Sequence, residues 1–226
     1  MSALDRLSPH RAKGTASLIA DQLRDLILDG SFQPGEQVNE VHVAARLEVS
    51  RGPVREAVQR LVQEGLLVQV RNRGTSVVVL DTEDIADVYQ GRLALEREAA
   101  RIVFERDATQ LVDDLESVLG RMSRALGRGE WADVTRADLA FHQTIVDSVG
   151  SRRMSRMFAT LAAETLLCLQ RFERIYDRRE QVIEQHQRLA DLLRAGDSEA
   201  FIDEIDWHLK NSVIRLSSAG SSQVGP

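Results

Sequence analysis

The stretch from Val49 to Leu67, VSRGPVREAVQRLVQEGLL, constrains the fold of this chain more than any other. Three apolar residues recur at helical spacing and can dock together on a core: Val54, Val58 and Leu61. Arg51 and Arg55 lie one turn apart on a different face. The stretch therefore predicts a short helix that packs through one face and presents two arginines on another.

Both ends of this predicted helix carry recognisable signals. Ser50 is a good N-cap, and Pro53 falls in the first turn, where backbone amides lack intrahelical partners. Gly65 is a common residue at a helix end. Because packing does not require arginines on the outer face, the pair indicates contact with an anion. An ordinary solvated face is the alternative.

The preceding residues predict two further helices. A helical stripe begins near Thr15 and ends at Asp29-Gly30, and Pro34-Gly35 then forms a turn into a short extended piece. Asn39 can cap a second helix, which only Glu48 and Val49 separate from Ser50. This is the spacing of a helix-turn-helix.

A β-hairpin should follow. Two β-branched runs flank Asn72-Arg73-Gly74, where Gly74 can supply the positive φ of a tight loop. Arg71 and Arg73 add positive charge at its tip. Three helices and a hairpin make a winged helix-turn-helix, whose third helix enters the DNA major groove while the wing follows the backbone or minor groove. A protein–protein module is the alternative; the concentration of arginines favours DNA.

The charge distribution agrees with selective contact rather than bulk attraction to nucleic acid. The net charge is −6, but residues 51–73 hold five Arg against two Glu. A local basic patch on an acidic protein suits specific phosphate contacts. The single Cys168 rules out an intramolecular disulfide, and no apolar run reaches membrane-spanning length. We therefore expect a cytoplasmic protein without membrane contact.

The chain as a whole is expected to be mainly α. We predict a flexible arm (1–14), a winged helix-turn-helix domain (15–80), an all-α effector-binding and dimerisation domain (81–218) and a disordered tail (219–226). From 82 to 218 there is no proline and no alternating strand pattern. Breaks in the amphipathic text predict a bundle of six helices, approximately 82–106, 108–127, 131–149, 151–175, 178–195 and 198–217.

The helical half contains three of the five histidines of the chain. Asp138 and His142 project from one face of a helix, while His186 and His208 belong to two other helices. If they converge, they form a mixed N/O site for a divalent transition metal with open coordination positions. Taken singly, His186 fits a surface or satisfied core histidine, and Asp138 with His142 fits a pair on a helix surface.

Two further residues are candidate ligand contacts. Arg92 and Glu96 lie one turn apart, and as a surface ion pair they would be unremarkable. A guanidinium beside a metal would instead suit a carboxylate, because its planar fork grips both oxygens. Asn211 lies one turn after His208 and is a geometric candidate for ligand contact.

The residues reveal no catalytic set. There is no glycine-rich phosphate loop and no nucleophile elbow, and Cys168 lies on a helical apolar stripe, which indicates packing. Three functions remain open: a regulator that senses a metal and a carboxylate; a regulator with a structural metal or none and a larger effector such as an acyl thioester; and a metallohydrolase with a DNA-binding head.

The N-terminal half resembles the GntR family of bacterial transcription regulators. The matching motifs are L-I-x-D-G-x-F-x-P-G-E at Leu26 to Glu36 and A-x-x-L-x-V-S-R-x-P-V-R-E-A at Ala44 to Ala57, followed by a glycine-tipped wing. The resemblance implies that Arg51 and Arg55 contact operator DNA and that Gly74 approaches its backbone. Val41 stands where some members have a further operator-contacting arginine.

The C-terminal half resembles the FCD effector domain of the FadR branch of this family, and six helices fit its VanR-like subgroup. The resemblance covers D-x-x-x-H, E-x-H and a histidine in the terminal helix. It implies that Asp138, His142, His186 and His208 hold zinc, or else nickel or manganese, and that Arg92 binds the carboxylate of a small organic-acid effector. It also implies a homodimeric regulator, most often a repressor, on pseudo-palindromic double-stranded DNA.

Overall fold

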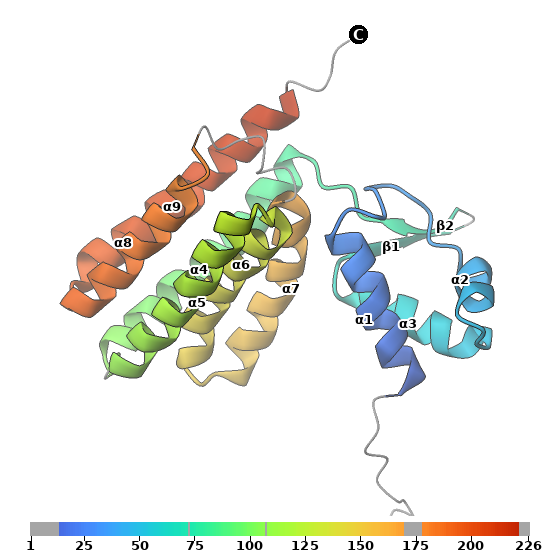
Figure 1. Cartoon of the computed structure of the whole chain (residues 1–226), viewed down its shortest axis with the longest axis horizontal. Coiled ribbons are helices and arrows are strands. Elements are labelled where there is room, and N and C mark those ends of the chain that lie inside the picture. The colour runs from blue at the N-terminus through green and yellow to red at the C-terminus, as the bar shows by residue number, and fades with distance from the viewer. Residues whose placement is uncertain (1–13, 72, 107, 170–177, 222–226) are drawn as a thin grey trace, which may run out of the picture. The chain divides into compact units, whose positions relative to one another are not determined.

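The computed structural model describes residues 14–71, 73–106, 108–169 and 178–221 (Figure 1). The chain divides into two compact units, whose main segments run up to Val77 and from Val78 onward. Most of the arm predicted over 1–14 and the last five residues of the predicted tail lie outside the described residues. The same holds for residues 170–175 of the fourth predicted helix of the helical half.

The first unit contains three helices and a two-stranded sheet. Its elements are α1 (Thr15–Leu28), α2 (Glu40–Arg46), α3 (Arg51–Gln63), β1 (Leu67–Val70) and β2 (Gly74–Val77). The apolar stripe predicted for α3 forms the centre of the core, with Val54, Val58 and Leu61 fully buried. Ile19, Leu23 and Ile27, from the stripe predicted for α1, are buried as well. The winged helix-turn-helix fold is thereby confirmed.

The turn between α2 and α3 contains a conformation that the sequence did not predict. Asn39 caps α2 as expected, and its side chain accepts hydrogen bonds from the amides of Val41 and His42. Glu48 then adopts a φ of 54°, the left-handed region that non-glycine residues rarely enter. Ser50 occupies the N-cap position of α3, but its side chain makes no capping hydrogen bond within the described chain.

The wing is an antiparallel hairpin in which Leu67 pairs with Val77 and Val70 pairs with Gly74. Gly74 has a φ of 86°, as the tight loop requires. The extended piece predicted after Pro34-Gly35 lies along β2, since the amide of Val38 donates to the carbonyl of Thr75 at 2.9 Å. This contact links the wing to the segment that leads into α2.

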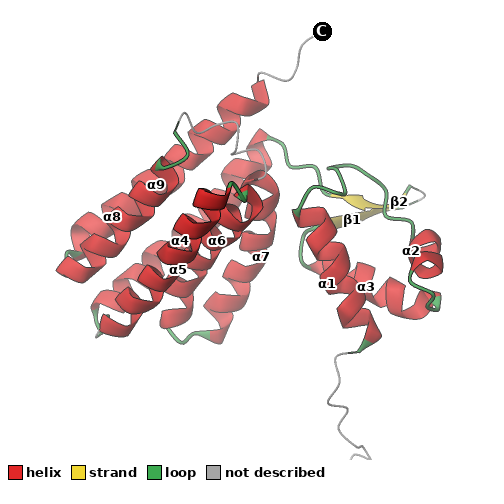
Figure 2. Ribbon diagram, viewed as in Figure 1, coloured by secondary structure: helices red, strands yellow, loops and turns green. Residues whose placement is uncertain are grey.

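The second unit is entirely helical in the part of the chain that is described (Figure 2). Six helices form it, as predicted: α4 (Thr82–Phe104), α5 (Thr109–Arg128), α6 (Trp131–Ser148), α7 (Arg152–Leu169), α8 (Gln181–Ala195) and α9 (Ser198–Ser221). The helix α9 extends three residues into the tail that was predicted to be disordered from residue 219, since adding a residue to an existing helix costs far less than starting one.

The packing of the bundle places α4 and α6 at its centre. The helix α4 packs against α6, α7 and α9, and α8 packs against α5 and α9. Large apolar side chains fill the space between them, among them Leu115, Met122, Phe141 and Phe158, all fully buried. None of the helices in the described ranges has the length and apolar content needed to cross a bilayer.

Candidate metal centre

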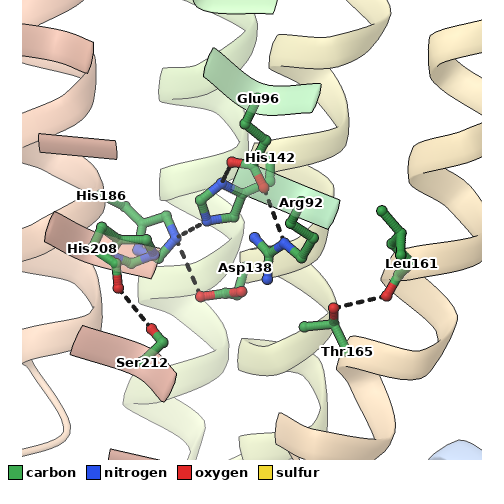
Figure 3. Close-up of polar contacts among 9 residues, drawn as sticks. All are labelled: Arg92, Glu96, Asp138, His142, Leu161, Thr165, His186, His208 and Ser212. Atoms are coloured by element: carbon green, nitrogen blue, oxygen red, sulfur yellow. Dashed lines mark hydrogen bonds and ion pairs between the residues drawn. The ribbon is translucent and has the colours of Figure 1, made fainter. Parts of the chain in front are cut away.

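The four residues predicted to hold a metal come together in the middle of the helical bundle (Figure 3). Asp138 and His142 project from the same face of α6, His186 comes from α8, and His208 from α9. All four are buried, and their candidate ligand atoms lie within 4.8 Å of one another. The alternative of scattered or surface residues is therefore wrong for this set, and their role as metal ligands stays a prediction.

The hydrogen bonds around the imidazoles point their free nitrogens inward. His142 Nδ1 donates to Glu96 Oε2 at 2.6 Å, and His186 Nδ1 donates to the carbonyl of Val182 at 2.6 Å. In the neutral form of each imidazole the proton therefore lies on Nδ1, and Nε2 presents a lone pair to the centre. The Nε2 of His186 lies 3.3 Å from His142 Nε2 and 3.2 Å from Asp138 Oδ1.

The third histidine completes the set. The His208 ring stacks on His142, with centroids 5.1 Å apart, and meets His186 edge-on at 4.8 Å. Its buried Nδ1 has no hydrogen-bond partner among the described residues. Metal–ligand bonds of about 2.0–2.2 Å place the donor atoms of one ion roughly 3–3.5 Å apart. The donor types fit a divalent transition metal, and so do the two separations measured from His186 Nε2, 3.3 and 3.2 Å.

The pKa values of Asp138, His142 and His208 are shifted in the directions that favour metal binding. Burial would raise the pKa of Asp138, but the neighbouring His186 holds it far below its usual range. Burial lowers the pKa of His142 despite the opposing effect of Glu96, and burial together with His186 lowers the pKa of His208 strongly. An ionised carboxylate and neutral imidazoles are the forms that bind metal.

The Arg92–Glu96 pair is buried rather than exposed, so the interpretation of an unremarkable surface pair was wrong. Arg92 Nε donates to Glu96 Oε1 at 3.0 Å, and the two side chains are 1% and 0% exposed. The burial arises because α6, α7 and α9 cover this face of α4. Burial opposes both charges, but Glu96 keeps the pKa of Arg92 raised, and His142 and Arg92 keep the pKa of Glu96 lowered.

Arg92 has one donor to spare. Its guanidinium lies over the rings of Tyr89 and Phe158, 5.0 and 5.6 Å from their centroids. The buried Nη2 has no hydrogen-bond partner in the described ranges. Leaving a buried donor unpaired costs about 1–3 kcal/mol. The position therefore suits an incoming acceptor such as a carboxylate oxygen.

A small cavity adjoins the metal centre. Arg92, Asp138 and His208 line it together with Tyr89, Trp131, Val134, Thr135, Leu169, Val182 and Ser212. Its volume is about 10 Å³, the space that a single water-sized occupant needs. Asn211, predicted as a ligand contact, does not line this cavity, and Ser212 does. Helix geometry explains the difference: at 100° per residue, the position four after His208 faces closer to it than the position three after.

The residues predicted to contact DNA lie on the surface of the first unit. Ser50, Arg51, Arg55, Arg71 and Arg73 are all exposed. Arg55 Nε lies 3.5 Å from Glu40 Oε2 on α2, and the Arg55 side chain remains 62% exposed. Gly74 occupies the first position of β2, beside the wing tip. The arginines are therefore accessible to a phosphate or a base edge.

A winged helix-turn-helix followed in the chain by a separate helical unit defines a class of two-domain DNA-binding regulators. The model of the "Bacterial regulatory proteins, gntR family" matches residues 15–77, and the model of the "FCD domain" matches residues 87–211. The chain belongs to the GntR family of bacterial transcription regulators and carries an FCD domain. It is accordingly a DNA-binding transcription regulator and not an enzyme.

Individual relatives align with this chain over most of their length. The HTH-type transcriptional regulator YdhC of Bacillus subtilis is 30% identical over 202 residues, covering 87% of this chain and 88% of that protein. The gluconate operon transcriptional repressor of the same organism is 27% identical, covering 91% and 87%. A crystal structure of a GntR regulator from Rhodococcus sp. RHA1 is 28% identical, with a TM-score of 0.80, covering 90% and 98%.

One member of the site was missed at the sequence level. Glu96 appeared only as a partner of Arg92, although it also holds the imidazole of His142. The signal was present in part, because Glu96 stands four residues after a candidate ligand contact on an amphipathic helix. Its second partner lies 46 residues away on another helix, so spacing alone does not reveal it.

Proposed function

We propose that this chain is a transcriptional repressor whose operator binding is controlled by a small organic acid bound at a metal in the helical unit. The observation that carries the proposal is that Arg92, with its unpaired Nη2, lines one cavity together with Asp138 and His208 of the buried Asp/His₃ group. A metal and a guanidinium on the same cavity suit the two oxygens of a carboxylate. The gluconate operon relative, which is named a repressor, supports the direction of control.

Four residues would hold the ion: Asp138, His142, His186 and His208. Zinc fits this N/O donor set best, and nickel or manganese are the alternatives. When bound, the metal supplies a Lewis-acid centre with coordination positions left for a carboxylate. Arg92 would grip the same carboxylate from the side, with its Nε held by Glu96.

The small cavity volume favours a compact effector over a bulky one such as an acyl thioester. Even a short organic acid exceeds the space of one water, so its entry requires side chains around the cavity to move. Such movement is the means by which a ligand gains different affinity for two states of a protein. Effector binding would thereby shift the spacing of two DNA-binding heads.

On the DNA side, we propose that residues 15–80 form the operator-binding domain and residues 81–218 the effector-binding and dimerisation domain. Arg51 and Arg55 would read bases from the N-terminal half of α3, with Ser50 contacting phosphate. Arg71, Arg73 and Gly74 would place the wing along the backbone. A homodimer would present two copies of α3 to a pseudo-palindrome.

The test combines metal content with DNA binding. Elemental mass spectrometry of protein purified without chelator should find about one metal ion per chain. The variant His142→Ala should lose this metal. The control Asp147→Asn removes a carboxylate from the exposed face of the same helix and should keep the metal. An operator selected from a random DNA library supplies the binding assay. Absence of metal from the wild type, with operator release by organic acids intact, would contradict the metal-dependent part.

A further inference from the structure

The Glu96 carboxylate connects the two halves of the proposed effector site. Its Oε1 accepts from Arg92 Nε at 3.0 Å and its Oε2 accepts from His142 Nδ1 at 2.6 Å, with no exposed surface left on the side chain (Figure 3). The other two imidazoles differ. His186 Nδ1 faces a neutral carbonyl and His208 Nδ1 faces no partner among the described residues. Among the described residues, a charged group lies against the Nδ1 of His142 but not against that of the other two imidazoles.

The charges buried around the site can be counted. We call Arg92, Glu96, Asp138 and the three imidazoles the buried charge cluster; it contains one guanidinium and two carboxylates. With neutral imidazoles, its net charge is −1. A divalent ion changes this to +1, and one carboxylate then brings it to zero. Because uncompensated charge in a buried site is costly, neutrality is strongly favoured.

We propose that Glu96 sets the charge of the effector, so that the metal-loaded site selects a ligand with one negative charge over a ligand with two. The inference rests on the proposed function, since it takes the metal and the carboxylate as the occupants. It adds a specificity-determining residue that touches neither of them. Glu96 acts through Arg92 and His142, and it is therefore a positioning residue as well as a fixed charge.

The neutral variant Glu96→Gln changes the count by one. The metal-loaded cluster then has a net charge of +2, which two negative charges compensate better than one. The amide also backs His142 less well than a carboxylate does, and loss of such an outer-shell partner lowers metal affinity by about 10–100-fold. Glu96→Gln should therefore weaken the metal and shift the ligand preference towards dianions.

The experiment uses two probe ligands of the same shape. Malonate carries two negative charges at neutral pH, and its monoamide, malonamate, carries one. Their Kd values are measured calorimetrically on the full-length chain saturated with zinc, and zinc affinity is measured separately by competition with a chelator. The ratio of the two Kd values cancels size and chelation effects common to both variants.

For Glu96→Gln, we expect the ratio of malonate Kd to malonamate Kd to fall at least about tenfold relative to the wild type. The control Glu98→Gln removes an equal charge two residues away, from a side chain that is 56% exposed, and should leave the ratio unchanged. Equal ratios in the wild type and Glu96→Gln would overturn the inference. So would an equal shift in Glu98→Gln, since that would reflect total charge.

A second variant separates the effect of the Glu96 charge from the effect of its side-chain length. Glu96→Asp keeps the charge but shortens the side chain, so it cannot hold Arg92 and His142 at the observed distances at once. We expect lower zinc affinity with the wild-type ratio of Kd values; a ratio shifted as in Glu96→Gln would contradict the charge argument. If the wild type binds zinc and both probes, but the ratio of Kd values is the same in the Glu96 variants, only the inference fails. If the wild type binds no zinc, the proposed function fails first.

Discussion

The arginines of the two units differ in their surroundings, and the difference separates two ways of recognising an anion. Arg55 on α3 is 62% exposed and has one loose carboxylate neighbour, whereas Arg92 on α4 is 1% exposed and is held by a buried carboxylate. The exposed arginine is free to follow a phosphate backbone, but water and salt screen its electrostatic interactions. The buried arginine is fixed in direction and strengthened by its low-dielectric surroundings.

The largest expected effect compares two Arg–Glu pairs with the same helical spacing. Glu96→Ala leaves Arg92 buried without a charge partner and should lower the free energy of unfolding of the metal-free protein by about 3–5 kcal/mol. Glu56→Ala removes the exposed partner of Arg60, 2.9 Å away on α3, and should cost roughly 0.3–0.5 kcal/mol. Urea denaturation measures both. Equal losses would break the contrast between buried and exposed charge.

The next largest effect is the stabilisation of the helical unit by zinc. Zinc added to chelator-treated protein at about 100 times its Kd should stabilise the helical unit by about 2.7 kcal/mol, because it binds only the folded state. His142→Ala should abolish this gain, and Arg55→Ala in the winged unit should keep it. Thermal unfolding followed by circular dichroism measures the shift. A gain that survives in His142→Ala would place the zinc elsewhere.

Variants in the winged unit should have a smaller effect, and they should change DNA binding while leaving zinc binding unchanged. Arg55→Ala is expected to weaken specific operator binding by roughly 1–3 kcal/mol if it contacts a base edge. Arg73→Ala should weaken binding to all sequences and reduce the salt dependence, as loss of a phosphate contact does. Fluorescence anisotropy at several salt concentrations distinguishes them. Zinc affinity should be the same in both variants, and operator affinity unchanged by Arg55→Ala would remove its assigned role.

The smallest effect tests the two helix caps of the winged unit. Asn39→Ala removes a side chain that accepts two amide hydrogen bonds and should cost about 1 kcal/mol of stability. Ser50→Ala removes a side chain that makes no cap bond in the described structure, so stability should change by less than roughly 0.5 kcal/mol. If DNA affinity falls in Ser50→Ala while stability holds, the hydroxyl contacts phosphate instead.

The local features of this fold could be predicted from the sequence because short-range physics decides them. The apolar stripe of α3, the cap at Asn39 and the positive φ at Gly74 each depend on residues within one or two turns. The left-handed Glu48 was not predictable in this way. Its φ of 54° falls in the short turn between α2 and α3, and no residue-type preference of Glu48 indicates it.

The candidate site also has features that local spacing predicts and features that only tertiary packing decides. Helical spacing placed Asp138 beside His142, and the family resemblance suggested His186 and His208 as their companions, but only the packing of α6, α8 and α9 brings the four together. Their role as metal ligands stays a prediction. Ser212, and not the predicted Asn211, lines the cavity beside His208.

The sequence by itself determined which helices form, approximately where they begin and end, and most of the residues that are candidates for the site. The tertiary structure decided which of those residues are buried together. Glu96 is the clearest case, since its sequence neighbourhood is that of an ordinary ion pair, whereas the bundle gives it two partners and no water. Burial is a property of everything packed around a side chain, and no local pattern contains that information.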